Sequence, residues 1–160
     1  MKKVLIALDY DPGAKKVAEA GYKLAKTMNA GIVILNVVSD EVYYSSLEYS
    51  PITEFSGFSN ADFSIMINNE GITKASEFFV NSIKTYLNDD SIEVLIEKGD
   101  FSGTILMVAE TINADVIVMG SHGRRGLDHI LMGSVTEKVL HHTTIPLFIV
   151  PVKGETKDLP

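Results

Sequence analysis

Short apolar runs and amphipathic stretches alternate along this chain. Val4–Leu8 is uniformly apolar and stops at an acidic turn over 9–13, a pattern typical of a strand buried on both faces. A helix is predicted next, with Asp11 as its cap and Pro12 in its first position. The helix ends at Asn29, and its apolar face is formed by Val17, Ala20, Leu24 and Met28.

A second apolar run, Ile32–Val38, is interrupted by Asn36 alone and is rich in β-branched residues, which predicts a second buried strand. Strand, helix and strand in this order form a parallel pair with a right-handed crossover. The stretch from Ser39 to Asn60 shows neither period, and its aromatic residues are Tyr43, Tyr44, Tyr49, Phe55 and Phe58. We interpret these aromatic residues as a cover for the sheet, a lid or a contact with a partner subunit.

The second half of the chain continues the alternation. A second helix begins between Ala61 and Thr73, and its apolar face is formed by Ile72, Ala75, Phe79, Ile83 and Tyr86. Ile92–Ile96 is the third predicted strand, and the helix after it is striped by Ile105, Val108, Ala109 and Ile112. The remaining elements are a strand over Asp115–Met119, a helix over Ser134–His142 and a strand over Pro146–Val152.

Five strands alternating with four helices predict an α/β fold, a single-domain parallel sheet of the Rossmann-like kind with helices on both faces. The domain is expected to span 1–152, followed by a polar C-terminal tail over 153–160. In such sheets ligands bind at the carboxyl ends of the strands, where the strand order reverses. The strand ends in question are the Asp9 turn, Val37 and Gly120.

Composition narrows the classes of function. The formal charge of −7 opposes nonspecific binding to nucleic acid or to an anionic membrane, because both require an excess of Lys and Arg. The absence of cysteine excludes disulfides, thiolate nucleophiles and Cys-based zinc sites, and it is typical of a reducing compartment. The N-terminal apolar run is shorter than a signal-peptide core, and no segment is long enough to span a bilayer. We therefore expect a cytoplasmic protein.

The loop after the fourth predicted strand is rich in glycine. It reads Gly120-Ser121-His122-Gly123, then nine residues, then Gly133-Ser134 at the head of a helix. Glycines admit an anion close to the backbone, and a helix N-terminus offers free N–H groups, so the combination suits a phosphate. Taken singly, each glycine also fits a simple turn. Ser134 with Glu137 fits a capping box, which leaves structural capping and ligand contact as alternatives for this serine.

Several catalytic and binding motifs are missing from the sequence. There is no Walker A loop, no G-x-G-x-x-G after the first strand, no G-x-S-x-G and no H-E-x-x-H. His141 and His142 are adjacent on a helix and point about 100° apart, which is poor geometry for sharing a metal ion. We expect no catalytic residue and no metal held by the protein alone.

The spacing G-x2-G-x9-G-S after an apolar strand resembles the signature of the ATP-binding branch of the universal stress protein family. The segments Val4–Asp9, with its acidic last residue, Ala114–Gly120 and Pro146–Val150 also resemble the first, fourth and last strands of that family. The resemblance implies adenine against Val37 and Met119, ribose near Asp9, and phosphates on the glycine loop and the helix after it. The full set of implied ATP contacts is Ala7, Asp9, Val37, Met119, Gly120, Ser121, His122, Gly123, Arg124, Arg125, Gly133, Ser134 and Val135.

Two positions depart from the family pattern. Asp11 stands where many members carry Ser or Thr, and Asn36 stands where many carry His. The Asp11 carboxylate adds negative charge near the phosphates, which either weakens ATP binding or favours a bridging Mg2+. The sequence does not decide between these outcomes.

The resemblance implies an ATP-binding stress-response or signalling module, in which nucleotide occupancy controls conformation or partner contacts. It also implies a homodimer formed through the last strand, Leu147–Val152. Two alternatives stay open: a slow ATP-hydrolysing or phosphate-transferring enzyme, and a nucleotide-independent interaction module. The sequence does not distinguish ATP from ADP, AMP or a cyclic nucleotide as the preferred ligand.

Overall fold

Strands and helices alternate through the parts of the chain that the structure describes. The computed structural model describes residues 1–39, 69–121 and 133–152. The elements in these ranges are β1 (Lys3–Leu8), α1 (Ala14–Met28), β2 (Gly31–Val38), α5 (Asn69–Leu87), β3 (Glu93–Lys98), α6 (Phe101–Thr111), β4 (Val116–Gly120), α7 (Ser134–His142) and β5 (Leu147–Val150). The predicted α/β fold and its order of elements are confirmed.

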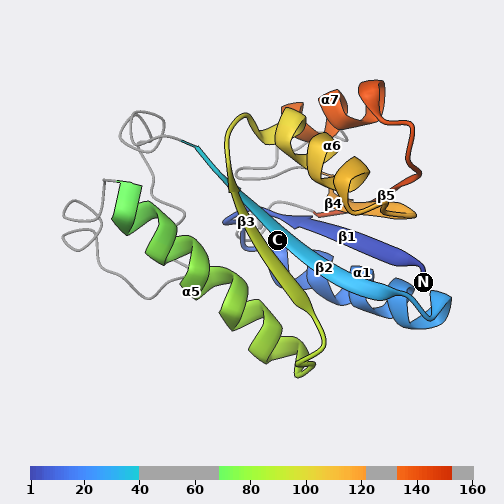
Figure 1. Ribbon diagram of the computed structural model, residues 1–160, viewed down its shortest axis with the longest axis horizontal. Helices are drawn as coiled ribbons and strands as arrows, with labels where there is room; N and C mark the ends of the chain where they lie inside the picture. Colours follow the sequence, from blue (N-terminus) through green and yellow to red (C-terminus); the bar gives the residue numbers. More distant parts are fainter. Residues whose placement is uncertain (40–68, 122–132, 153–160) are drawn as a thin grey trace, which may run out of the picture.

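Five parallel strands form one sheet in the order β3-β2-β1-β4-β5 (Figure 1). The chain builds outward from β1 to β3, then returns to add β4 and β5 on the other side of β1. β1 therefore lies at the centre, and its Ile6 pairs with Ile34 of β2 and with Val118 of β4. The strand order reverses between β1 and β4, which makes this pair the topological switch point.

Helices cover both faces of the sheet. α1 and α5 pack on one face, whereas α6 and α7 pack on the other (Figure 1). Alternate side chains of each strand enter the two cores, so that Ile6 faces α1 and α5 while Leu5 faces α6 and α7. Both side chains are fully buried. The apolar run Val4–Leu8 of β1 is thus explained by burial on both faces of the strand.

The start of α1 differs from the sequence prediction. The helix begins at Ala14 with Gly13 as its N-cap, so Pro12 is not its first residue and Asp11 is not its cap. The Asp11 carboxylate instead accepts a hydrogen bond of 2.6 Å from the Gly13 N–H, and the Asp11 carbonyl accepts one of 2.9 Å from the Ala14 N–H. Asp11 therefore stabilises a turn between β1 and α1. The predicted end at Asn29 is confirmed, because this residue caps the helix with a positive φ of 53°.

The end of α5 holds a second difference. Four residues of the predicted apolar face are buried, namely Ile72, Ala75, Phe79 and Ile83. Tyr86 was predicted on the same face, but that prediction is wrong, because its side chain is 46% exposed. The Tyr86 hydroxyl donates a hydrogen bond to Glu19 of α1, and the Lys15 ammonium lies 4.9 Å from the centre of its ring. Polar contacts with α1, rather than burial, hold this residue.

Some predictions concern residues outside the described ranges. They are the aromatic cover between 40 and 60, the polar tail over 153–160, and the loop positions His122, Gly123, Arg124 and Arg125. The start of the second helix agrees with its predicted window, because α5 begins at Asn69. Among the helices in the described ranges, none is both long and apolar enough to cross a membrane.

A polar pair is buried where β2 packs on α5. Asn36 and Ser76 have no exposed surface. The Ser76 hydroxyl donates a 2.5 Å hydrogen bond to Asn36 Oδ1, and Asn36 Nδ2 donates one of 2.9 Å to the Leu8 carbonyl. The two side chains thereby connect α5, β2 and the last residue of β1. Since a buried amide needs such partners, the pair explains how an asparagine fits into an otherwise apolar strand.

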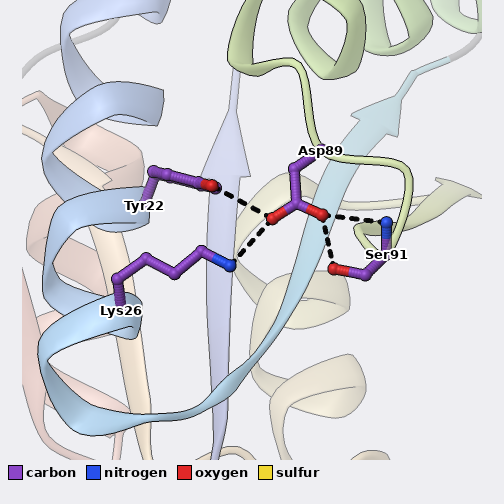
Figure 2. Close-up of polar contacts among 4 residues, drawn as sticks. All are labelled: Tyr22, Lys26, Asp89 and Ser91. Atoms are coloured by element: carbon purple, nitrogen blue, oxygen red, sulfur yellow. Dashed lines mark hydrogen bonds and ion pairs between the residues drawn. The ribbon is translucent and has the colours of Figure 1, made fainter.

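A carboxylate connects the end of α1 to the turn between α5 and β3 (Figure 2). Asp89 accepts hydrogen bonds from the Ser91 N–H at 2.9 Å and the Ser91 hydroxyl at 2.5 Å. On the α1 side, its other oxygen lies 2.9 Å from Lys26 Nζ and 3.1 Å from the Tyr22 hydroxyl. Hydrogen bonds from Ser91 and Lys26 hold the pKa of Asp89 well below its ordinary value, and the bond to Asp89 raises the pKa of Lys26.

The buried pair predicts the effect of Ser76→Ala. This change leaves Asn36 Oδ1 buried without its partner, so the free energy of unfolding should fall by about 1–3 kcal/mol. Ser82→Ala is the matched control on the same helix, since the Ser82 hydroxyl donates only to the Phe79 carbonyl. Its cost should stay below about 1 kcal/mol. Urea unfolding measures both, and equal costs for the two variants would contradict the assigned role of Ser76.

The Asp89 cluster predicts an acid-dependent loss of stability. Because the folded pKa is depressed, Asp89 stabilises the fold fully above its unfolded pKa of about 3.9, and this contribution is lost as pH falls toward the lower folded pKa. Asp89→Asn should therefore lower the melting temperature at pH 7, by an amount that shrinks below pH 4. Asp90→Asn, at the exposed neighbouring position, is the control. A difference from the parent that does not change with pH would rule out this cause.

Candidate functional site

The carboxyl ends of β1, β2 and β4 meet at one edge of the sheet, beside the switch point. Leu8, the last residue of β1, pairs with Asn36 near the end of β2, and β4 lies on the other side of β1. Asp9 directly follows Leu8, and Gly120 is the last residue of β4. The fold therefore brings together the strand ends at which the sequence predicted a ligand site.

One face of this edge is apolar. Ala7, Val37 and Met119 come from three neighbouring strands, and all three belong to the core between the sheet and α6 and α7. Val37 and Met119 are buried, and Ala7 is partly buried. Apolar side chains arranged in this way form a wall on which a flat ring can pack. The positions predicted to contact adenine are thus neighbours on one face of the sheet.

The N-terminus of α7 lies at the same edge. Gly133 is its N-cap, and the first hydrogen bond of the helix joins the Glu137 N–H to the Gly133 carbonyl at 3.0 Å. Ser134 is therefore the first helical residue, which excludes the capping-box alternative for this serine. Its side chain is exposed. The N–H groups of the first three helical residues have no acceptor within α7, as at any helix start, so this end of the helix suits an anion.

Ser121 lies directly after β4, and the protein uses its polar groups. Its N–H donates to the Val150 carbonyl at 2.9 Å, and its carbonyl accepts from the Gly133 N–H at 2.7 Å. Its hydroxyl accepts from the Val152 N–H at 2.9 Å and lies 3.4 Å from the Val152 carbonyl. Beside it, the Thr136 hydroxyl donates to the Gly120 carbonyl at 2.9 Å. These bonds fix the end of β4 against both β5 and the start of α7.

Two carboxylates mark the turn after β1. The Asp9 carboxylate accepts a 2.8 Å hydrogen bond from the Tyr10 N–H, and Asp9 makes a further contact within the protein. Asp11 is 8% exposed and accepts from the Gly13 N–H. Asp9 follows the strand directly and is only partly buried, so it is the better placed of the two to meet a polar ligand at this edge.

The segment after β5 runs from the edge of the sheet to the start of α1. Val152 is buried in the core that contains α1, and a side chain at Gly13 would overlap its Cγ1 methyl group. The Lys16 ammonium donates a 2.8 Å hydrogen bond to the Pro151 carbonyl. Residues 151 and 152 are therefore held by α1 on one side and by Ser121 on the other.

Sequence reasoning missed Val152 and Lys16, and it treated Gly13 as a turn residue. The contacts of all three are with parts of the fold that are distant in the chain, so no local pattern marks them. The one signal in the sequence for this contact was the glycine at position 13. Its backbone φ is −82°, a value that any residue can adopt. Close approach of Val152, rather than backbone conformation, therefore makes glycine necessary there.

Groups that hold metal ions do not gather in the described parts of the chain. Within residues 1–39, 69–121 and 133–152, no three His, Asp or Glu side chains are placed to share an ion. His141 lies 3.8 Å from Glu137, one helical turn away, and His142 Nδ1 lies 2.8 Å from the Lys138 carbonyl. Both histidines thus make local contacts within α7.

A surface hollow of about 310 Å³ lies between α1 and α5, lined by Glu19, Tyr22, Lys23, Tyr86 and Leu87. Its aromatic rings already face cations of the chain, because Lys15 lies over Tyr86 and Lys26 lies over Tyr22. Tyr86 and Leu87 end α5 at the side where β3 begins. The hollow is therefore remote from the carboxyl edge, and we do not assign the ligand site to it.

Known proteins resemble this chain along nearly its whole length. A sequence profile of the universal stress protein family matches residues 1–151. Universal stress protein MJ0577 of Methanocaldococcus jannaschii is 29% identical, covering 96% of this chain and 96% of the relative. Universal stress protein A homolog 2 of Coxiella burnetii is 27% identical, covering 96% of this chain and 97% of the relative.

Solved structures of this family also resemble the chain in their fold. The structure of MJ0577 has a TM-score of 0.71 and 27% identity, covering 96% of this chain and 98% of that chain. UspA from Lactobacillus plantarum has a TM-score of 0.69 and 18% identity, covering 93% and 97%. A universal stress protein crystallised in complex with cAMP has a TM-score of 0.57 and 17% identity, covering 93% and 95%. At these identities the last two likenesses concern the fold alone.

The contact between Gly13 and Val152 predicts that shortening Val152 restores the stability lost on Gly13→Ala. Gly13→Ala should lower the free energy of unfolding by about 1–3 kcal/mol, because the added methyl group overlaps a stiff β-branched side chain. Val152→Ala removes that side chain, so the same glycine change in this background should cost less than about 0.5 kcal/mol. A double-mutant cycle by urea unfolding measures the coupling. Additive costs would show that the two residues do not meet as described.

Proposed function

Because this chain belongs to the universal stress protein family, we propose that it is an ATP-binding stress-response module. The observation that carries the proposal is the meeting of two surfaces at the β1/β4 switch point. One is the apolar wall of Ala7, Val37 and Met119, and the other is the N-terminus of α7. A nucleotide requires both, since its base is apolar and flat whereas its phosphates are anionic.

The adenine ring packs against Val37 and Met119, and Ala7 lines the same place through its backbone. Asp9 accepts hydrogen bonds from the ribose hydroxyls, because its carboxylate lies at the end of the central strand. This arrangement orients the nucleotide along the carboxyl edge, with its base over β1, β2 and β4. The triphosphate then extends toward α7.

The phosphates bind at the start of α7 and on the glycine loop. Ser134 and Val135 supply backbone N–H groups, and Ser134 also a hydroxyl, at the positive end of the helix dipole. Gly133, whose N–H donates to the Ser121 carbonyl, lets the phosphates approach because it has no side chain. Gly120, Ser121, His122 and Gly123 of the loop lie along the phosphates, and Arg124 and Arg125 pair with phosphate charge. Ser121 contributes mainly by fixing the loop, because its polar groups bond within the protein. Local basic and backbone groups thereby overcome the overall negative charge of the chain.

Mg2+ belongs to the ATP phosphates rather than to a protein cage. The Asp11 carboxylate already accepts the Gly13 N–H and is nearly buried, and Asp11 makes a further contact within the protein. The described residues offer no set of three side chains for a metal ion. Asp11 therefore acts mainly as a turn residue, and its charge is partly offset by the hydrogen bond from the Gly13 N–H.

The module acts as a cytoplasmic homodimer joined through β5. This strand is at the edge of the sheet, and its Phe148 side chain is 40% exposed. An apolar edge strand offers unpaired backbone groups that a second copy can satisfy. ATP occupancy then controls conformation or partner contacts. Prolonged incubation with ATP should yield no more ADP than a protein-free control, because binding rather than turnover is the proposed activity.

Ser134→Asp tests the phosphate site against the stability of the fold. A carboxylate in the first turn of α7 favours the helix dipole, so the melting temperature should not fall. The same carboxylate repels the phosphates, so the Kd for ATP should rise by about ten-fold or more, as measured by calorimetry. Ser134→Asn is the matched neutral control and should bind within about three-fold of the parent.

Adenosine serves as the second ligand in this experiment. Since adenosine carries no phosphate, its affinity should be the same for the Asp and Asn variants. ATP binding of equal strength in these two variants would place the phosphates away from α7. Loss of both ligands from the Asp variant alone would instead indicate damage to the apolar wall.

A further inference from the structure

We propose that Ser121 is a positioning residue that couples the phosphate site to the segment after β5. For brevity, residues Pro151 and Val152 are called the C-terminal strap. The inference rests on the proposed function and explains how bound ATP can affect β5, the strand proposed to form the dimer. Its basis is the position of Ser121 between the start of α7, the end of β5 and the strap.

Each polar group of Ser121 fixes a different element. The carbonyl holds the Gly133 N–H at the N-cap of α7, and the N–H continues the ladder to Val150 of β5. The hydroxyl accepts the Val152 N–H and faces the Val152 carbonyl, which requires a group that is donor and acceptor at once. One residue thus connects the phosphate-binding helix start with both the edge strand and the strap.

The strap itself reaches the other side of the site. Val152 is buried against Gly13 at the N-cap of α1, and Lys16 holds the Pro151 carbonyl. Gly13 in turn donates to Asp11, two residues after Asp9. The strap therefore spans from Ser121 and the α7 side to the turn that follows β1, and displacement of the strap disturbs both.

Binding of ATP at α7 and packing of the C-terminal strap against Ser121 and Gly13 are consequently linked. ATP phosphates that bind the Ser134 and Val135 N–H groups hold the start of α7 in place, which favours the geometry in which Ser121 accepts the Gly133 N–H. That geometry also sets the Ser121 hydroxyl toward Val152. By thermodynamic reciprocity, a seated strap raises ATP affinity and bound ATP protects the strap. Since the strap directly follows β5, a change in the position of the strap on ATP binding reaches the proposed dimer edge without any large movement.

Amide hydrogen exchange tests this coupling at a single atom. In the parent, ATP should slow exchange of the Val152 N–H by about ten-fold, and the Ile92 N–H, at the opposite edge, should not respond. Ser121→Ala removes the acceptor, so the Val152 amide should exchange fast with or without ATP, and ATP affinity should fall by about ten-fold. Ser121→Thr keeps the hydroxyl and should restore both effects.

Gly13→Ala provides a second route to the same test. It displaces Val152 from the α1 side while Ser121 remains intact, so it should also weaken ATP binding and abolish the ATP effect at the Val152 amide. If Ser121→Ala fails to fold, this variant still tests whether ATP binding is coupled to the Val152 amide. ATP binding to the parent without any change at Val152 would overturn the coupling and leave the proposed function standing. A parent that binds no ATP would overturn both.

Discussion

β1 pairs in parallel with β2 on one side and with β4 on the other, and the rest of the structure depends on this double pairing. Parallel strands end at the same edge, so the pairing brings Asp9, Val37 and Gly120 together although they come from distant parts of the chain. It also requires helices on both faces, because the central strands β1, β2 and β4 are buried on both sides. The site is thus a consequence of topology before it is a consequence of any single side chain.

The two edges of the sheet are held by different chemistry. At the amino edge, Asp89 gathers Tyr22, Lys26 and Ser91, so that charge and hydrogen bonds connect α1 to the start of β3. At the carboxyl edge, most hydrogen bonds have a backbone group as one partner. The side chains that join them are the hydroxyls of Ser121 and Thr136, the Lys16 ammonium and the carboxylates of the turn after β1. The first arrangement makes a firm structural clamp that requires a charged carboxylate. The second keeps polar backbone groups and glycine near the surface, which is the environment that a phosphate ligand needs.

The fold was predictable from the sequence because strand and helix periods are local signals. The bounds of α7 were predicted correctly, and all five strands were predicted within two residues. One error arose where a tertiary contact decides, and the other where two local hydrogen bonds compete for one carboxylate. Tyr86 has helical spacing but is held by Glu19, and Asp11 has the chemistry of a cap but bonds within the preceding turn. The contact of Ser121 with Val152 joins residues 31 positions apart, and no local pattern predicts it. The roles of the glycine loop rest on its resemblance to the family signature.

Amide NMR titration measures the central claim, that ATP binds at the switch point with its phosphates on α7. The parent protein is titrated separately with ATP and with adenosine. We expect the amides of Ser134 and Val135 to shift saturably with ATP but not with adenosine, while those of Asp9 and Met119 shift with both ligands. Saturable ATP shifts confined to other parts of the sheet, or no saturable shift at any of these four amides, would contradict nucleotide binding at this edge.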